Sequence, residues 1–171
     1  MLSLSQTTGY VVLALSRLNP PGGTPVRVAH IAELTGIPQP YLQKVMHRLA
    51  TRGLVTTVRG RSGGLLLGRD PRKISLMQVA EAVEGRQWLP ACILGLEDCS
   101  DLRCCPTHEF WKVERAKIEE ELRGTVLSDV IDFERVRGGA KLKTRWKPPV
   151  ADPLVRAVTP KARRKTARKE C

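Results

Sequence analysis

A glycine-rich segment in the middle of the chain constrains the fold more than any other sequence feature. Residues 60–64 include three glycines and separate two short apolar runs, at 54–59 and 65–67. Glycine accepts the positive φ values that tight hairpin connections need, so the pattern predicts two short strands joined by a turn. Arg59 and Arg61 lie near the tip of this hairpin. The segment therefore predicts a small β-wing with cations at its end.

Three amphipathic helices are expected before the wing. In each, apolar residues recur at the spacing that keeps them on one face of a helix. The three stripes are Tyr10, Val11, Ala14, Leu15 and Leu18; Val28, Ile31, Ala32 and Thr35; and Leu42, Val45, Met46 and Leu49. Ser3 and Gln6 have the spacing of a capping box for a first helix of about four turns. Gly36 is expected to cap the C-terminus of the second helix.

The opposite side of the third helix is polar. It carries Gln39, Gln43, Lys44, His47 and Arg48. Such a face is often only solvated, but its place between a glycine turn and a glycine-rich wing favours contact with DNA. We expect Gln39, Gln43 and Lys44 to approach base edges. Arg48 is expected to contact phosphates, and Arg59 and Arg61 to reach the minor groove.

Four potential soft-metal ligands lie within 17 residues further along the chain. Cys92, Cys99, Cys105 and His108 have the spacing C-x6-C-x5-C-x2-H, with Cys104 beside the third cysteine as an alternative to it. Three thiolates and an imidazole suit zinc or an iron–sulfur cluster. A set of unligated thiols is the remaining interpretation.

Two further helices flank this cysteine loop. Ser75 and Gln78 form a capping-box pattern at the start of one helix, which ends at Gly85. Pro106 suits the first turn of the other, a long helix. The apolar stripe of the long helix is Trp111, Ile118 and Leu122, with Val113 nearby. Because the preceding helices and wing are already compact, we expect a second copy of the chain to cover this stripe. A short final helix is expected at 126–131.

Positive charge is concentrated at the C-terminal end. The chain has 29 Lys and Arg against 17 Asp and Glu, and residues 134–171 hold 13 of these cations against three carboxylates, a net charge of +10. Solvated cations attract phosphate through counterion release, which predicts salt-sensitive but unspecific affinity for nucleic acid. The segment lacks apolar periodicity and is expected to be disordered.

The chain is expected to be cytoplasmic and to make no contact with a membrane. No stretch approaches the roughly 20 apolar residues needed to cross a bilayer. Arg17 is the first cation, so no positive segment precedes an apolar run and no secretory signal is expected. A reducing compartment favours metal ligation or thiol chemistry over structural disulfides.

These expectations define a mainly α fold with a small β-wing. The architecture is a winged helix-turn-helix plus a long dimerisation helix. The expected division is a DNA-binding domain at 1–87, a cysteine-rich cluster-binding loop at 88–105, a dimerisation helix with a short C-terminal helix at 106–133, and a disordered basic tail at 134–171.

Residues 1–133 resemble a family of bacterial winged-helix regulators. The family includes the iron-sulfur cluster regulator (IscR), the nitric-oxide-sensitive repressor (NsrR) and the cysteine-metabolism repressor (CymR). The likeness rests on the N-terminal helix, the segment 31–55 with Tyr41-Leu42, the wing at 59–64, the helix at 77–84, and Cys92, Cys99, Cys105 and His108 followed by Trp111. The resemblance implies a dimer on a palindromic operator, with the recognition helix in the major groove and the wing at the minor groove.

The resemblance also implies a cofactor. Members with three cysteines and a histidine in this loop are similar to 2Fe-2S proteins, whereas 4Fe-4S nitric-oxide sensors take an N-terminal aspartate, where this chain has Thr7 and Thr8. Cys105 is favoured over Cys104 because it preserves C-x2-H to His108. The first cysteine spacing is one residue longer than in the iron-sulfur cluster regulator, and Leu65 replaces the usual aromatic residue after the wing glycines.

The resulting hypothesis is a homodimeric, DNA-binding transcription regulator, a repressor that senses iron–sulfur status, redox state or nitric oxide through an iron–sulfur cluster. Cluster binding would brace the loop and set the spacing of the two recognition helices. One alternative is a zinc-stabilised or cofactor-free regulator that responds to thiol state or a protein partner. Another is a nucleoid-type protein dominated by its basic tail. A thiol oxidoreductase is disfavoured, because the chain has no C-x-x-C at a helix start in a βαβ setting.

Overall fold

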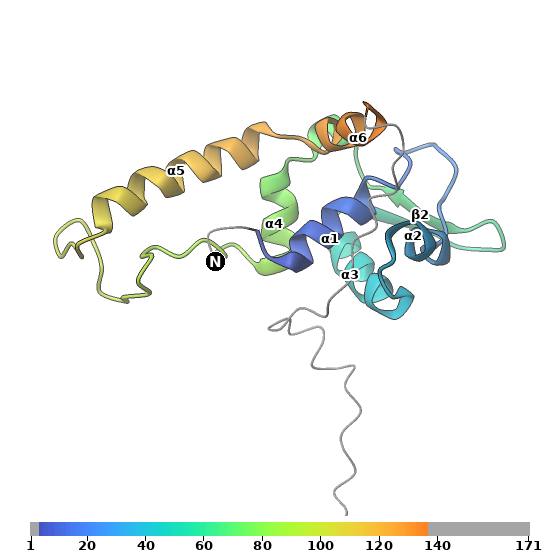
Figure 1. Ribbon diagram of the computed structural model, residues 1–171. Helices are drawn as coiled ribbons and strands as arrows, with labels where there is room; N and C mark the ends of the chain where they lie inside the picture. The colour runs from blue at the N-terminus through green and yellow to red at the C-terminus, as the bar shows by residue number, and fades with distance from the viewer. Residues whose placement is uncertain (1–3, 137–171) are drawn as a thin grey trace, which may run out of the picture.

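The computed structural model describes residues 4–136 as a mostly helical molecule with one small sheet (Figure 1). Its elements in chain order are α1 (Gln6–Leu15), α2 (Val28–Thr35), α3 (Gln39–Thr51), β1 (Val55–Val58), β2 (Gly64–Leu67), the 3-10 helix η1 (Pro71–Lys73), α4 (Leu76–Glu84), α5 (His108–Gly124) and α6 (Leu127–Val136). This arrangement confirms the predicted mainly α fold with a β-wing. No helix among the described residues is both long and apolar enough to cross a membrane.

The core forms where the predicted apolar stripes meet. Leu15, Ile31, Leu42, Leu49 and Leu67 are each at most 1 % exposed and belong to one continuous cluster. Every residue of the predicted α3 stripe is buried. Burial of side chains of this size stabilises the fold by about 1.5–3 kcal/mol each. The pattern in the sequence therefore correctly identifies the face of α3 that packs inward, and by elimination the face that remains outside.

The wing is an antiparallel hairpin with an additional partner. Its register runs from Val55 opposite Leu67 to Val58 opposite Gly64. Val26, just before α2, forms a bridge to Leu65 with two backbone hydrogen bonds, of 2.9 and 2.8 Å. A Cβ atom at Gly64 would lie only 2.6 Å from the carbonyl oxygen of Val26, so this close approach requires glycine. The wing is thereby joined to the chain ahead of α2.

The helix termini differ in how well the sequence predicts them. Ser5 caps α1 by accepting a hydrogen bond from the Thr8 amide at 3.2 Å, so the predicted capping box of Ser3 and Gln6 is wrong. Ser3 itself lies outside the described residues. At 10 residues, α1 also has about three turns rather than four. By contrast, both hydrogen bonds of the predicted capping box at the start of α4 form, each at 3.2 Å.

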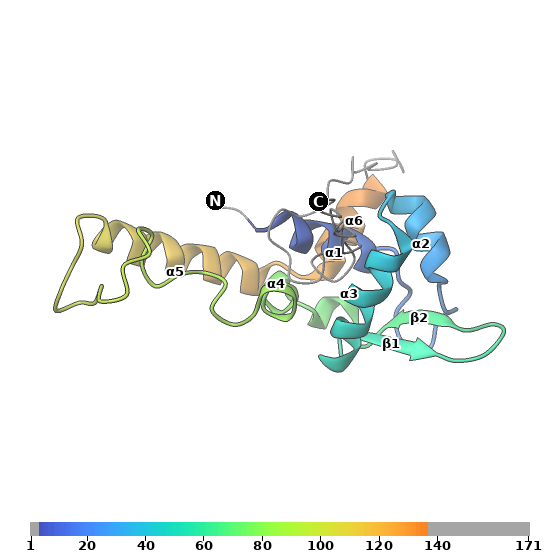
Figure 2. The same cartoon turned by 90° about the horizontal axis from the view of Figure 1, so that it is seen from below.

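Helix α5 extends away from the helical body, as Figures 1 and 2 both show. Its predicted start is displaced, since α5 begins at His108 with Thr107 as N-cap and leaves Pro106 outside its first turn. Only Trp111 of the predicted stripe is buried, while Ile118 and Leu122 are half-buried. The stripe is therefore only partly covered within one chain.

Helix α6 returns to the body, where Leu127 is fully buried in the core. The Glu134 carboxylate accepts a hydrogen bond from Ser16 at 2.9 Å and pairs with Arg17 at 3.3 Å, which ties α6 to the end of α1. The helix extends to Val136, five residues beyond its predicted end. Most of the basic tail, from residue 137, and its predicted disorder lie outside the described residues.

Candidate metal centre and DNA-binding surface

Three cysteine sulfurs come together in the loop between α4 and α5. The Sγ atoms of Cys92, Cys99 and Cys105 all lie within 4.8 Å of one another, and those of Cys92 and Cys105 are 3.7 Å apart. Cys92 is buried and the other two are half-buried, and none of the three forms a disulfide. The structure thus assembles, as free thiols, the three cysteines that the sequence singled out.

His108 adds a nitrogen to this cluster. It is the first residue of α5, and its Nδ1 atom lies 3.2 Å from Cys99 Sγ. On the other side of the ring, Nε2 lies 3.0 Å from the Asp101 carboxylate. The imidazole side chain is only 11 % exposed. All four residues chosen from the sequence therefore lie at one place, with His108 in direct contact with one of the three sulfurs.

Cys104 has different surroundings from its neighbour Cys105. Its side chain is exposed, and its thiol donates a hydrogen bond to the Asp101 carbonyl oxygen at 3.4 Å. Its sulfur lies within 4.8 Å of His108 and Glu109 but does not join the group of three sulfurs. Of the two adjacent cysteines, Cys105 is the one that faces the other thiols.

Hydrogen bonding lowers the pKa of the Cys105 thiol. The hydroxyl of Thr107, 3.4 Å away, and the Thr107 amide lower the pKa of Cys105 to about 7 against the effect of burial, helped by the thiols of Cys99 and Cys92. At Cys99 the Cys105 amide lowers the pKa, but burial and the neighbouring thiols outweigh it and raise the pKa overall. Because the thiolate is the form of cysteine that binds metal ions, the lowered pKa favours metal binding by Cys105 near neutral pH.

The loop is fastened to α5 by Trp111. This side chain is 3 % exposed, and its indole Nε1 donates a hydrogen bond of 2.8 Å to the Pro90 carbonyl oxygen. Beside it lies a groove of about 370 Å³ between the start of α1 and α5. Apolar side chains from both elements and the loop line it, among them Leu4, Trp88, Ile93, Ile118 and Leu122.

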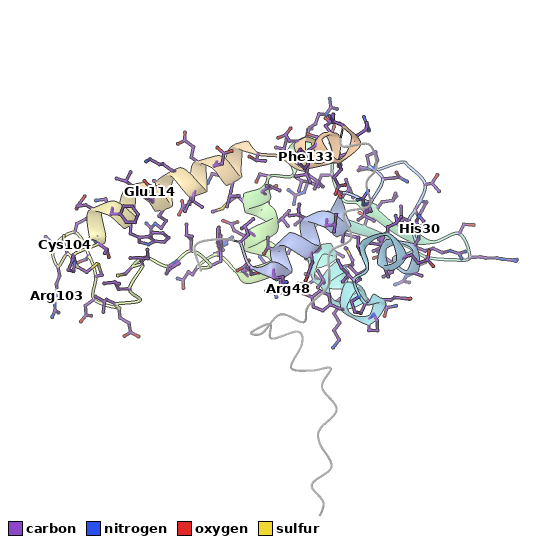
Figure 3. The ribbon with its side chains drawn as sticks, in the orientation of Figure 1. His30, Arg48, Arg103, Cys104, Glu114 and Phe133 are labelled. Carbon is purple, nitrogen blue, oxygen red and sulfur yellow. The ribbon has the colours of Figure 1, made fainter. Side chains whose placement is uncertain are left out.

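The polar face of α3 lies on the helical body, away from the cysteine loop (Figures 1 and 3). Gln39 and Gln43 are exposed on this face, and Lys44 and Arg48 are half-buried beside them. Arg59 and Arg61 are exposed at the wing. Figure 3 shows Arg48 on the helical body and Cys104 at the far end of α5. All six residues predicted to contact DNA are thus at least partly accessible on α3 and the wing.

Comparison with known proteins decides the family. The family described as "Rrf2: Iron-dependent Transcriptional regulator" matches residues 4–133. The chain belongs to the Rrf2 family. It is 36% identical over 115 residues to the HTH-type transcriptional regulator IscR of Sodalis glossinidius, covering 67% of this chain and 69% of that protein. As a member of the Rrf2 family, it is a transcriptional regulator.

Solved structures of Rrf2 relatives share the fold. The structure of T. potens IscR has 29% sequence identity and a TM-score of 0.63, covering 80% of this chain and 91% of that one. CymR, the global cysteine regulator of B. subtilis, has 26% identity and the same TM-score, covering 78% and 98%. The predicted resemblance to a family that includes IscR and CymR is confirmed.

Three contacts in this Rrf2 protein were not predicted from the sequence. The Arg27 guanidinium at the start of α2 donates a hydrogen bond of 3.1 Å to the Arg61 carbonyl oxygen and so steadies the wing. Asp101 accepts hydrogen bonds from both His108 and Lys112, which lower the pKa of Asp101, with Lys112 having the larger effect. The apolar periodicity of the sequence predicts neither the contact between Arg27 and Arg61 nor the contacts of Asp101. Only the spacing of His108 and Lys112, four residues apart on one helix, hints at a shared partner.

Proposed function

We propose that this Rrf2 regulator is a cytoplasmic homodimer that represses transcription and senses iron–sulfur status, redox state or nitric oxide. Cys92, Cys99, Cys105 and His108 hold an iron–sulfur cluster, 2Fe-2S rather than 4Fe-4S. The observation that carries the proposal is the convergence of three sulfurs within 4.8 Å, with an imidazole nitrogen 3.2 Å from one of them. The loop at 88–105 is the sensing segment, and 1–87 is the DNA-binding domain.

The chemistry of the donor set fits such a cluster. Three free thiols and one imidazole are soft or borderline ligands, and their partial burial limits access of water. An iron–sulfur cluster bound there would supply a centre whose state changes with oxidants, nitric oxide and iron supply. The same donors also suit zinc, so a zinc-stabilised regulator remains the second outcome of the test below.

The path from the loop to the DNA-reading helix runs through packed helices. The loop follows α4 directly, and α4 packs against α1, α3 and α5. Trp111 and the Pro90 carbonyl oxygen hold the loop to α5. A change in how the cysteine residues hold the loop therefore moves α5 relative to α4, and α4 is in contact with α3.

The exposed apolar side chains of α5 support the proposed dimer. Phe110 is 60 % exposed and Val113 is 50 % exposed, and Ile118 and Leu122 of the same helix are half-buried. A second copy of α5 would remove this apolar surface from water. A two-fold symmetric dimer matches a palindromic operator whose half-sites are about 34–36 Å apart. A small change in the spacing of the two recognition helices therefore weakens their simultaneous binding to both half-sites.

In this proposal the two DNA-contacting elements have separate roles. Gln39, Gln43 and Lys44 approach base edges in the major groove, where amides and cations recognise adenine and guanine. Arg48 contacts phosphate, and the wing residues Arg59 and Arg61 enter the minor groove.

Anaerobic purification with analysis of iron, acid-labile sulfide and zinc tests the cofactor. We expect a coloured protein with visible absorption and equal amounts of iron and sulfide, about two of each per protomer for a 2Fe-2S cluster. A colourless protein with one zinc per protomer would instead establish the zinc-stabilised regulator. Loss of colour in air, followed by reconstitution with iron and sulfide, serves as the control for a reversible site.

A further inference from the structure

We propose that Asp101 is a positioning residue that commits His108 to binding the metal centre through Nδ1. The inference rests on the proposed function and adds to it the ligand atom and the residue that selects it. The two ring nitrogens of His108 have different partners. Nδ1 lies 3.2 Å from Cys99 Sγ, and Nε2 lies 3.0 Å from Asp101 Oδ1.

The carboxylate determines which nitrogen carries the proton. At neutral pH an Asp side chain is ionised and can only accept hydrogen bonds. Nε2 of His108 must therefore be the donor to Asp101. A neutral imidazole has a single N–H, so Nδ1 keeps its lone pair on the side of the ring that meets Cys99. Hydrogen bonding of the non-ligating nitrogen to a carboxylate also raises the basicity of the ligating one.

The chain holds Asp101 in place by local backbone structure. Ser100 and Arg103 close a four-residue turn around it with hydrogen bonds of 3.0 Å, from the Arg103 amide, and 3.3 Å, from the Ser100 amide. Figure 3 shows Arg103 and Cys104 at this turn, beside the start of α5. Leu102 at the turn is fully exposed, so apolar packing of that side chain does not hold the turn.

Lys112 completes the arrangement. It lies one turn after His108 on α5, and its Nζ donates a hydrogen bond of 2.6 Å to the same Asp101 oxygen. Two donors from one face of α5 thus fix the orientation of the carboxylate. The Asp101 carbonyl oxygen meanwhile accepts from the Cys104 thiol, which engages that cysteine with the turn rather than with the three sulfurs.

The contacts of Asp101 are better explained by their effect on the orientation of the His108 ring than by a contribution to the stability of the fold. The side chains of Asp101 and Lys112 are 70 % and 54 % exposed, and ion pairs this accessible to water contribute little to folding. His108, in contrast, is 11 % exposed and lies against a sulfur. The effect of Asp101 is therefore expected on the histidine ring and its ligand atom, and not on the stability of the fold.

The test compares Asp101→Ala with Asp98→Ala. Asp98 is a matched control, because it is an exposed carboxylate of the same loop that pairs only with Arg103 among the contacts seen in the structure. Long-range proton–nitrogen NMR of the metal-free, reduced protein reports which nitrogen of His108 carries hydrogen. We expect the Nε2–H form in the wild type and in Asp98→Ala, and a mixture of both forms in Asp101→Ala.

Iron retention provides the second measurement. On the reconstituted protein under a chelator and without oxygen, Asp101→Ala should weaken iron retention by about 10- to 100-fold, while Asp98→Ala matches the wild type. The inference is overturned if the wild type has the Nδ1–H form, or if Asp101→Ala changes neither the NMR signal nor iron retention. Failure of the proposed function has a different signature, namely the Nε2–H form in a protein that takes up no iron.

Discussion

The helical body and the cysteine loop are held together in different ways. In the body, side chains such as Leu42 and Leu67 are 1 % exposed and pack into one continuous core. In the loop, Leu94 and Leu96 are more than half exposed and Leu102 is fully exposed. The loop depends instead on its sulfurs, on the turn around Asp101 and on Trp111. Exclusion of water from apolar side chains therefore fixes the helical body, whereas in the loop few apolar side chains are buried. Under the proposed function, a bound metal centre would add the constraint that the loop lacks.

Removal of one sulfur from the loop is expected to have the largest effect. Cys105→Ala takes away the thiol with the lowered pKa and leaves two sulfurs. We expect complete loss of bound iron, measured by metal analysis and visible absorption after anaerobic reconstitution, while the far-UV circular dichroism of the body is unchanged. Cys104→Ala is the matched control and should retain iron, because its sulfur lies outside the group of three. The opposite result for the two variants would show that Cys104 is the ligand.

The body should respond to truncation of apolar side chains and the loop should not. Leu42→Ala removes a buried side chain from the core, and we expect the free energy of unfolding of the metal-free protein to fall by about 2–5 kcal/mol. Leu102→Ala removes the same atoms from a fully exposed site and should change the free energy of unfolding by less than about 0.5 kcal/mol. Urea denaturation followed by circular dichroism measures both. Equal effects would mean that the loop contributes to the core.

Substitutions on α3 test whether this helix of the body is the one that contacts DNA. Lys44→Ala removes a cation expected at base edges, and we expect operator binding to weaken by about 1–3 kcal/mol with relaxed specificity at one position. Lys117→Ala is the control, since this lysine is on α5 and pairs with Glu114. Fluorescence anisotropy on an operator selected from random DNA measures both variants. If Lys117→Ala has the larger effect, α3 is not the recognition helix.

The smallest expected effect concerns the hydrogen bond from Thr107. A thiol with a pKa of about 7 becomes the reactive thiolate as pH rises through 7, so alkylation of Cys105 in the metal-free protein should increase over that range. Thr107→Val removes the hydroxyl that contributes most to the lowered pKa, and should move this increase to higher pH. Mass spectrometry of iodoacetamide-labelled peptides measures it. An unchanged profile in Thr107→Val would assign the lowered pKa to another neighbour.

The sequence predicts the body well because its signals are local. Leu42, Val45, Met46 and Leu49 follow helical spacing, and all four are buried as expected. The cysteine spacing likewise singled out the residues that converge. Spacing identifies these side chains because few other soft donors lie nearby in the chain.

Contacts between distant segments carry no such signal. The pairing of Val26 with Leu65 uses backbone atoms 39 positions apart in the chain, and the link from Arg27 to Arg61 ends on a carbonyl oxygen. The cap of α1 was misplaced because Ser3 and Ser5 are equally good capping residues, and tertiary contacts decide between them. The Ser5 amide donates to Glu84, which fixes the start of the helix at Gln6.

A DNA titration with and without iron tests the connection between the cysteine loop and the helical body most directly. The same operator fragment is titrated anaerobically with iron-loaded wild type, with metal-free wild type and with Cys105→Ala. The account predicts that loaded and metal-free protein differ in affinity by about 5- to 150-fold, and that Cys105→Ala behaves as the metal-free form under both conditions. Identical affinities for loaded and metal-free protein would contradict it.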